Sequence, residues 1–286
     1  MWLRNSLYSI AYLNLFVSHL GAIYCLIVGI SFNAVLYLLV TYIVRMLATT
    51  VFFHRFISHK SFSPTNKWVT YTGCFIACSA GQMGPSWWKV HHLNHHKYTD
   101  SNQDPHSPLA PYKGIMGLLY AEFAWVLVPK YAYPNPDELP IDIENDPILK
   151  LMDRLHFVPS LGLAYLSVLM GGTDYLLALC LSTTLLFHAN GFLNSIGHLY
   201  GKQDFMTKDG SRNNYFVAIL TLGDGWHNSH HAFPKSARHG YTVRDDGIAK
   251  VPDPTFWLIQ LMEKSKLCHS IIEYDNDLLK TKIKQR

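Results

Sequence analysis

The stretch YSIAYLNLFVSHLGAIYCLIVGI, residues 8–30, is followed directly by SFNAVLYLLVTYIVRMLATTVFF, residues 31–53. A helix needs about 20 mostly apolar residues to cross the hydrocarbon core of a bilayer, and each run satisfies that requirement. Residues 31–33 leave room only for a short turn between the two runs. We therefore expect a transmembrane hairpin over residues 8–53.

A second pair of apolar segments covers residues 157–172 and 174–198, with the sequence GGTD between them. The first of these is short and needs its flanking residues to span a bilayer. Charged residues make up only 15% of the chain, against about 25% in a typical soluble domain. The alternative, two buried hairpins of a large helical protein, suits these lengths less well. We predict an all-α integral membrane protein with four transmembrane helices in two hairpins.

Positive charge orients the predicted spans. Neither turn contains lysine or arginine, and apart from Arg45 every such residue lies in the N-terminus, in segment 54–156 or after residue 198. Because cytoplasmic loops carry the excess of lysine and arginine, these three parts are expected to face the cytoplasm. The first run lacks a cleavage site and is expected to be retained.

The prediction is therefore a single domain over residues 1–286. A cytoplasmic helical cap is expected from segments 54–156 and 199–271, and a loose charged tail from 272–286. Within the cap, the apolar segment 68–88 is expected to lie in the membrane interface or to dip into the membrane and return, with Trp68, Trp87 and Trp88 at headgroup depth. Segment 114–130 is expected to lie there too.

The chain has sixteen histidines, and several are clustered. The first box is HRFISH, residues 54–59, the second HHLNHH, residues 91–96, and the third HNSHH, residues 227–231. On a helix, positions i, i+3 and i+4 share one face, so the second and third boxes each present three imidazoles together. His198 follows Asn194 by four positions, and that amide could hold a water molecule.

These segments supply nine candidate metal ligands: His54, His59, His92, His95, His96, His198, His227, His230 and His231. Nine are too many for one ion and suit two. Imidazole binds zinc, copper, iron and nickel. A structural zinc site would normally recruit thiolates, but Cys74 and Cys78 lie in an apolar stretch and are expected to be buried. The H-E-x-x-H pattern of metalloproteases is absent.

Other polar residues have competing interpretations. Asp104 and His106 could contact a metal-binding histidine and orient its ring, or they could form a turn. His19 and His188 are expected to hydrogen-bond within the bundle. A basic patch of Lys235, Arg238, His239 and Arg244 follows the third box. It could contact an anionic acyl carrier, an acidic electron donor or phospholipid headgroups, or be an ordinary solvated face.

The three boxes, together with NSIGHLYG, GDGWHNSHHAFP and HKYTD…DPHS, resemble those of the membrane fatty acyl desaturases. The resemblance is closest to the group containing animal stearoyl-CoA desaturases and bacterial Δ9 desaturases, from about residue 8 to about residue 265. It implies two non-haem irons held by the nine histidines and by a water on Asn194. It also implies insertion of a cis double bond into a long-chain acyl substrate, with consumption of O₂ and two electrons.

Two departures qualify the resemblance. Acyl-CoA members carry an Arg-Asp pair before the second box, where this chain has Val90 and His91, so the acyl carrier could be CoA, acyl carrier protein or a membrane lipid. The His-Pro-Gly-Gly signature of a fused cytochrome is absent. A separate electron donor is therefore expected, either a ferredoxin or a b-type cytochrome with its reductase. His227 stands where front-end desaturases have glutamine.

Related di-iron membrane enzymes hydroxylate substrates or make acetylenic bonds, and ligand chemistry alone does not separate these outcomes. A metal transporter would place ionisable residues along its spans, whereas here the clusters lie outside them. The predicted location is a multi-pass one with the site on the cytoplasmic side. The ending KIKQR fits an endoplasmic reticulum retrieval pattern, and a bacterial cytoplasmic membrane fits equally well. No nucleic-acid partner is expected.

Overall fold

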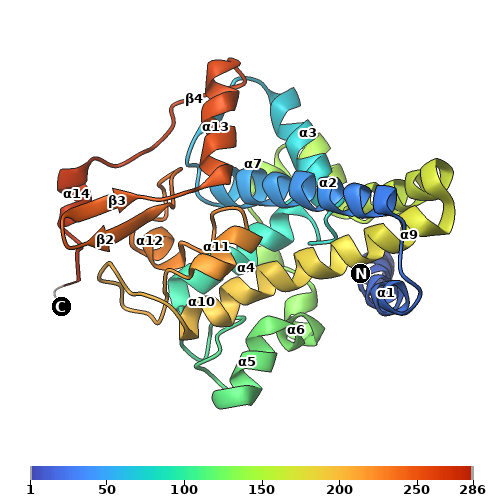
Figure 1. The fold of residues 1–286 in the computed structure, drawn as a ribbon, viewed down its shortest axis with the longest axis horizontal. Coiled ribbons are helices and arrows are strands. Elements are labelled where there is room, and N and C mark those ends of the chain that lie inside the picture. Colours follow the sequence, from blue (N-terminus) through green and yellow to red (C-terminus); the bar gives the residue numbers. More distant parts are fainter. Residues whose placement is uncertain (1, 285–286) are drawn as a thin grey trace.

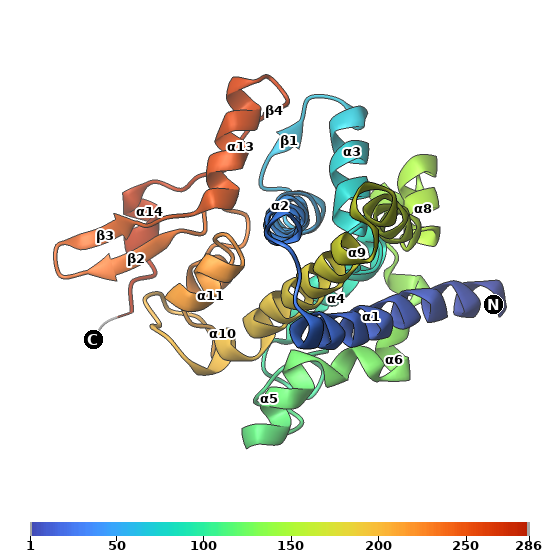
Figure 2. The same ribbon diagram turned by 45° about the vertical axis from the view of Figure 1, so that its right-hand side comes forward.

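The computed structural model describes residues 2–284. Three long helices form a bundle: α1 (Trp2–Val28), α2 (Phe32–Ala48) and α9 (Val158–Asn194). Helix α9 packs against both α1 and α2 along its length (Figure 1). Outside the bundle, the C-terminal strands and α13 lie on one side and α5 and α6 on another (Figure 2).

The two predicted hairpin turns lie side by side. Gly29 has a φ of 76° before the first turn, and Gly172 has a φ of 63° where α9 is broken. That break separates the predicted segments 157–172 and 174–198. The Ser31 hydroxyl donates to Asp174 at 2.5 Å, joining both turns at one end of the bundle.

Two segments of the described chain, Phe32–Ser58 and Val158–Leu199, are long and apolar enough to cross a membrane, and Tyr12–Val28 is a shorter apolar helix. Their outer faces expose large apolar side chains, for example Leu20, Ile27, Leu39 and Leu169. An exposed apolar band of this kind suits a lipid environment. The four-span arrangement stays a prediction.

Helix α2 continues directly into a π-helix, η1 (Thr49–Ser58). Short π segments are rare and often occur at functional sites. The backbone N–H of His59 donates to the carbonyl of His54 at 3.2 Å, so these two residues lie one above the other. On an ordinary α-helix two residues five positions apart would point in different directions, so the wider π turn is what aligns them.

The cap is built from short elements. The first part contains α3 (Lys67–Cys78), α4 (Pro85–Tyr98), α5 (Gly114–Glu122), η2 (Ala124–Leu127), α6 (Pro129–Ala132), η3 (Pro136–Glu138), α7 (Ile141–Glu144) and α8 (Pro147–Arg154). The second contains α10 (Ile196–Leu199), α11 (Tyr215–Leu220), α12 (His227–Ala232), α13 (Pro254–Lys264) and α14 (Asn276–Lys280).

The cap is not wholly helical, so the all-α prediction needs correction. Strands β2 (Tyr241–Arg244) and β3 (Gly247–Lys250) form an antiparallel hairpin, and β1 (Ser63–Pro64) pairs with β4 (Cys268–His269). The predicted loose tail also packs on the cap. Leu279 of α14 is fully buried in an apolar cluster with Phe205 and Tyr241.

The main apolar core lies where η1, α3 and α13 meet. Phe53, Cys74 and Ile259 are fully buried there. All five cysteines are free and buried, as predicted for Cys74 and Cys78. Trp68 is exposed, but Trp87 is buried and stacks on Trp125 with ring centroids 5.4 Å apart. The Trp87 side chain therefore faces a cavity, and the depth of Trp68, Trp87 and Trp88 in a membrane stays a prediction.

Candidate metal centre

The nine predicted histidines come together from four parts of the chain. One group contains His54, His59, His92 and His230, and a second contains His95, His198, His227 and His231. Within each group the nitrogen atoms that could bind a metal lie within 4.8 Å of one another. The histidines of the two groups belong to η1 and its C-cap residue His59, and to the helices α4, α10 and α12.

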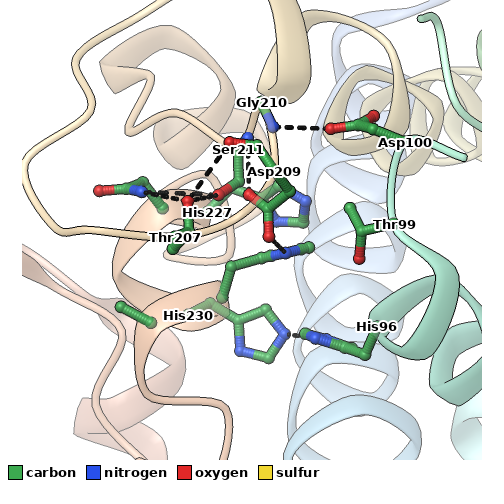
Figure 3. A network of polar contacts seen from close by, with 12 residues as sticks. His96, Thr99, Asp100, Thr207, Asp209, Gly210, Ser211, His227 and His230 are labelled. Atoms are coloured by element: carbon green, nitrogen blue, oxygen red, sulfur yellow. Dashed lines mark hydrogen bonds and ion pairs between the residues drawn. The ribbon is translucent and has the colours of Figure 1, made fainter.

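His96 lies between the two groups. Its Nε2 atom is 3.1 Å from Nε2 of His92 and 2.8 Å from Nε2 of His230, and it also clusters with His231. Figure 3 shows His96, from α4, facing His230 of α12. The arrangement provides two groups of four imidazoles with one further imidazole between them.

Four of the nine histidine rings are hydrogen-bonded to carboxylates on the side away from the centre of the cluster. The Nδ1 atom of His54 donates to Asp224 at 2.6 Å, and that of His95 donates to Asp104 at 2.9 Å. His198 donates in the same way to Asp100 at 3.1 Å, and His231 to Asp209 at 3.1 Å. Because Nδ1 carries the proton in these four rings, Nε2 carries a lone pair and points into the cluster.

The pair His95 and His231 tests whether the site fits a metal. Both rings have Nδ1 bound to a carboxylate, and their Nε2 atoms face each other at 3.3 Å. When both rings are neutral, two lone pairs face each other at that distance and repel, since no hydrogen lies between them. A cation bound by both nitrogens would remove the repulsion. The donor set therefore fits metal ions that accept imidazole.

Electrostatics keeps most of these rings neutral, as metal binding requires. Burial, together with the neighbouring imidazoles, holds the pKa of His92, His96 and His230 well below the ordinary histidine value. The same causes lower the pKa of His227 and His231. In contrast, burial opposes the charged form of His95, but the carboxylates of Asp104, Asp100 and Asp209 together outweigh it and raise the pKa of that ring.

Sequence reasoning missed several residues of this site. Asp100, Asp209 and Asp224 orient ligand rings, and Arg55 clamps Asp224 with a contact of 2.9 Å while also binding Asp253. Asp100 and Asp224 lie in motifs that were quoted for the resemblance, so their position next to a box was a usable signal. Asp209 lies in the loop before α11, and no local pattern marks it.

The residues expected to support the ligands lie near them. Asp104 binds His95, and the His106 ring packs against His95 with centroids 4.4 Å apart. Asn194 lines the same cavity as His92 and His95. Their roles toward a metal stay predictions.

The predicted basic patch is not continuous. Lys235 and Arg244 are exposed, but Arg238 donates to Glu273 at 2.9 Å and stacks over Phe256. His239 is fully buried, with its Nδ1 atom 3.2 Å from Asp224. It belongs to the surroundings of the first histidine group and not to the surface.

A cavity of about 910 Å³, including its open mouth, adjoins the two histidine groups. At one end its wall includes the candidate ligands His54, His92, His95 and His227. Its other end lies between α1 and α9, at Tyr12, Leu15 and Phe187. The remaining wall has apolar or aromatic side chains at Met83, Trp87, Trp88, Trp125, Val126 and Leu193, and polar ones at Gln82, His91, His106, Glu122, Asn190 and Asn194. An apolar chain placed here would run past the imidazoles.

Comparison with known proteins identifies the family. Residues 8–242 match the family model for fatty acid desaturases. The chain belongs to this family, whose members are oxidoreductases that act on fatty acyl substrates.

Three relatives show the range of activities in the family. An acyl-CoA C20 Δ5-desaturase of Anemone leveillei is 35% identical over 75% of this chain and 66% of its own length. An sn-2 palmitoyl-lipid 9-desaturase of Nostoc sp. (strain 36) is 31% identical over 77% and 74%. An sn-1 stearoyl-lipid 9-desaturase of Anabaena variabilis is 31% identical over 78% and 80%. The chain thus matches just under two thirds of the Anemone protein and about three quarters of the other two.

Proposed function

We propose that this chain is an O₂-dependent Δ9 desaturase that inserts a cis double bond into a saturated long-chain acyl group at a di-iron centre. The observation that carries the proposal is the position of the two histidine groups beside an apolar cavity. Two relatives named as lipid 9-desaturases support the Δ9 position. Two electrons per turnover would come from a separate ferredoxin or b-type cytochrome.

The nine histidines would hold two irons, which when bound supply the activation of O₂ and the removal of hydrogen from two adjacent carbons. Asn194 would hold a water at the cavity side. The carboxylates Asp104 and Asp209 keep the hydrogens of their partner rings on Nδ1. Trp87 and Trp125 form an apolar wall that excludes water from the chain's path and holds the acyl chain next to the ligands.

We further propose a membrane lipid as the acyl carrier. His91, which stands where acyl-CoA desaturases have an aspartate, is 5% exposed and packs between Trp87 and Tyr131. A buried neutral ring cannot meet the polar adenine nucleotide of CoA at the surface. Helix α5 exposes Ile115 and Met116, which suits contact with lipid. The proposed location is a multi-pass one, with four spans and a cytoplasmic cap.

Expression in a host that lacks its own desaturase, followed by mass spectrometry of the lipids, tests the activity. We expect new mono-unsaturated chains on membrane lipids with wild-type protein and none with His230→Ala. Purified wild-type protein should hold about two irons per chain. An unchanged lipid profile despite iron-loaded, membrane-inserted protein would refute the proposal. Hydroxylated products would show that the same site catalyses hydroxylation and not desaturation.

A further inference from the structure

A second histidine pair lies outside the metal centre, between α1 and α9. The Nε2 atoms of His19 and His188 face each other at 3.3 Å. His19 donates its Nδ1 hydrogen to the carbonyl of Leu15 at 2.8 Å, and His188 donates its own to Glu122 at 3.0 Å. Both Nε2 atoms therefore carry lone pairs, and one added proton would bridge them.

This pair continues into a hydrogen-bonded chain. Glu122 receives the Nδ1 hydrogen of His188 on one carboxylate oxygen and the Ser195 hydroxyl on the other, at 2.5 Å. The His188 side chain is 35% exposed, whereas that of Glu122 is 7% exposed. Glu122 also lines the cavity that contains His92, His95 and Asn194. The chain thus has an accessible outer end and a buried inner end at the cavity.

Ionisable groups in apolar helices are costly and are retained mainly where they act. The nine-histidine cluster includes none of the three residues His19, His188 and Glu122. The apolar side chains of Ile115 and Met116 on α5 are exposed, so the helix that carries Glu122 suits the membrane surface. His188 lies within the predicted span 174–198 and meets this helix through Glu122.

We propose that the His19–His188 pair and Glu122 form a proton relay that feeds the cavity beside the metal centre. This rests on the proposed function, because desaturation consumes protons. One –CH₂–CH₂– unit, one O₂, two electrons and two protons give one –CH=CH– unit and two H₂O. The donor protein supplies the electrons and water supplies the protons. A proton shared by the two Nε2 atoms passes through the His188 ring to the Glu122 carboxylate and from there to water in the cavity.

Glu122→Gln and His188→Ala test the relay in the iron-loaded, membrane-embedded enzyme with its electron donor. The glutamine keeps the size and hydrogen-bonding capacity of Glu122 but cannot carry a proton. We expect turnover to fall at least tenfold in both variants, with more O₂ released as peroxide per product and a larger solvent deuterium isotope effect. Iron content and the apparent affinity for acyl substrate should not change. Glu263→Gln, an exposed glutamate on α13, is the matched control.

Added imidazole distinguishes proton transfer from a structural role. Because the His188 side chain is partly exposed, free imidazole should restore at least part of the turnover of His188→Ala while failing to raise that of the wild type. If His188→Ala does not fold, His188→Gln replaces it in the isotope and peroxide measurements. Wild-type turnover and isotope effect in both Glu122→Gln and the His188 variant would overturn the relay.

A readout without iron addresses the pair itself. In the metal-free protein, a proton held between two ring nitrogens should give a strongly downfield NMR resonance that His19→Ala removes. Its absence from the wild type would overturn the shared proton. If instead the wild type holds iron but forms no unsaturated product in its host, the proposed function fails. That result differs from the outcomes of the variant, imidazole and NMR experiments, which test the relay.

Discussion

The Nε2 atoms of His95 and His231 lie 3.3 Å apart, while each ring donates its Nδ1 hydrogen to its own carboxylate. The two aspartates thus prepare both rings as ligands before any metal arrives. Hydrogen bonds that orient a metal-binding ring typically contribute about 10- to 100-fold to metal affinity. The loss of one of these carboxylates should therefore lower metal affinity nearly as much as the loss of a histidine.

Asp209→Ala should lower the affinity for iron about 10- to 100-fold, because His231 loses the partner that fixes its protonation. Titration of metal-free protein with Fe²⁺ measures the effect. Asp137→Ala, at an exposed position in η3, is the control and should bind iron like the wild type. Equal affinity in both variants would mean that Asp209 does not orient the ligand.

The division of the histidines into two groups predicts separate losses of metal. His59 belongs only to the first group and His198 only to the second. We expect His59→Ala and His198→Ala each to retain about one iron per chain. His96→Ala should weaken both sites, because its ring contacts both groups. Metal analysis of the purified variants checks this, and loss of both ions from His59→Ala would argue for a single coupled site.

Asp153 should make stability depend on pH. Its carboxylate accepts the backbone N–H of Ser86 near the start of α4 at 2.8 Å, and burial raises the pKa of Asp153 to about 6. The folded protein therefore binds a proton that the unfolded chain releases between about pH 4 and pH 6, so this group's contribution to stability falls as pH rises through that window.

Asp153→Asn keeps an acceptor for Ser86 but removes the ionisation. At pH 7 it should stabilise the protein by about 1–2 kcal/mol, less than the full pKa shift implies because the side chain keeps some contact with water. Below pH 4 the gain should disappear. Thermal unfolding in detergent at both pH values provides the comparison, and an equal gain at both would contradict the titration of Asp153.

The clustering of the candidate ligands could be predicted from the sequence, because three imidazoles at i, i+3 and i+4 must share a helix face, as His92, His95 and His96 do. His54 and His59, five positions apart, needed a π-helix to align, and nothing in their residue types distinguishes that turn from an ordinary one. The long-range partners were harder. Asp209 reaches His231 across 22 positions, and such pairings depend on loop packing that local periodicity does not report.

Arg45 is a buried charge within the apolar helix α2, and it predicts a stability effect. Its guanidinium is 1% exposed and binds four neutral acceptors: Thr41 O at 2.9 Å, Ser79 O at 3.3 Å, Thr183 Oγ1 at 2.8 Å and Ser182 Oγ at 2.6 Å. These acceptors come from α2, the C-cap of α3 and α9, so one side chain ties three elements together.

Arg45→Lys keeps the charge but replaces the planar fork by a single ammonium group, which cannot reach all four acceptors. We expect a loss of about 2–4 kcal/mol, since bonds from a charged donor contribute about 1.5–3 kcal/mol each and only some are lost. Thermal unfolding in detergent measures this, with Arg154→Lys at an exposed position as the control. Iron content at low temperature should be unchanged, because Arg45 contacts none of the nine histidines in its hydrogen bonds. An unfolding temperature equal to that of the control would show that the fork geometry is dispensable and that the charge alone holds the three elements.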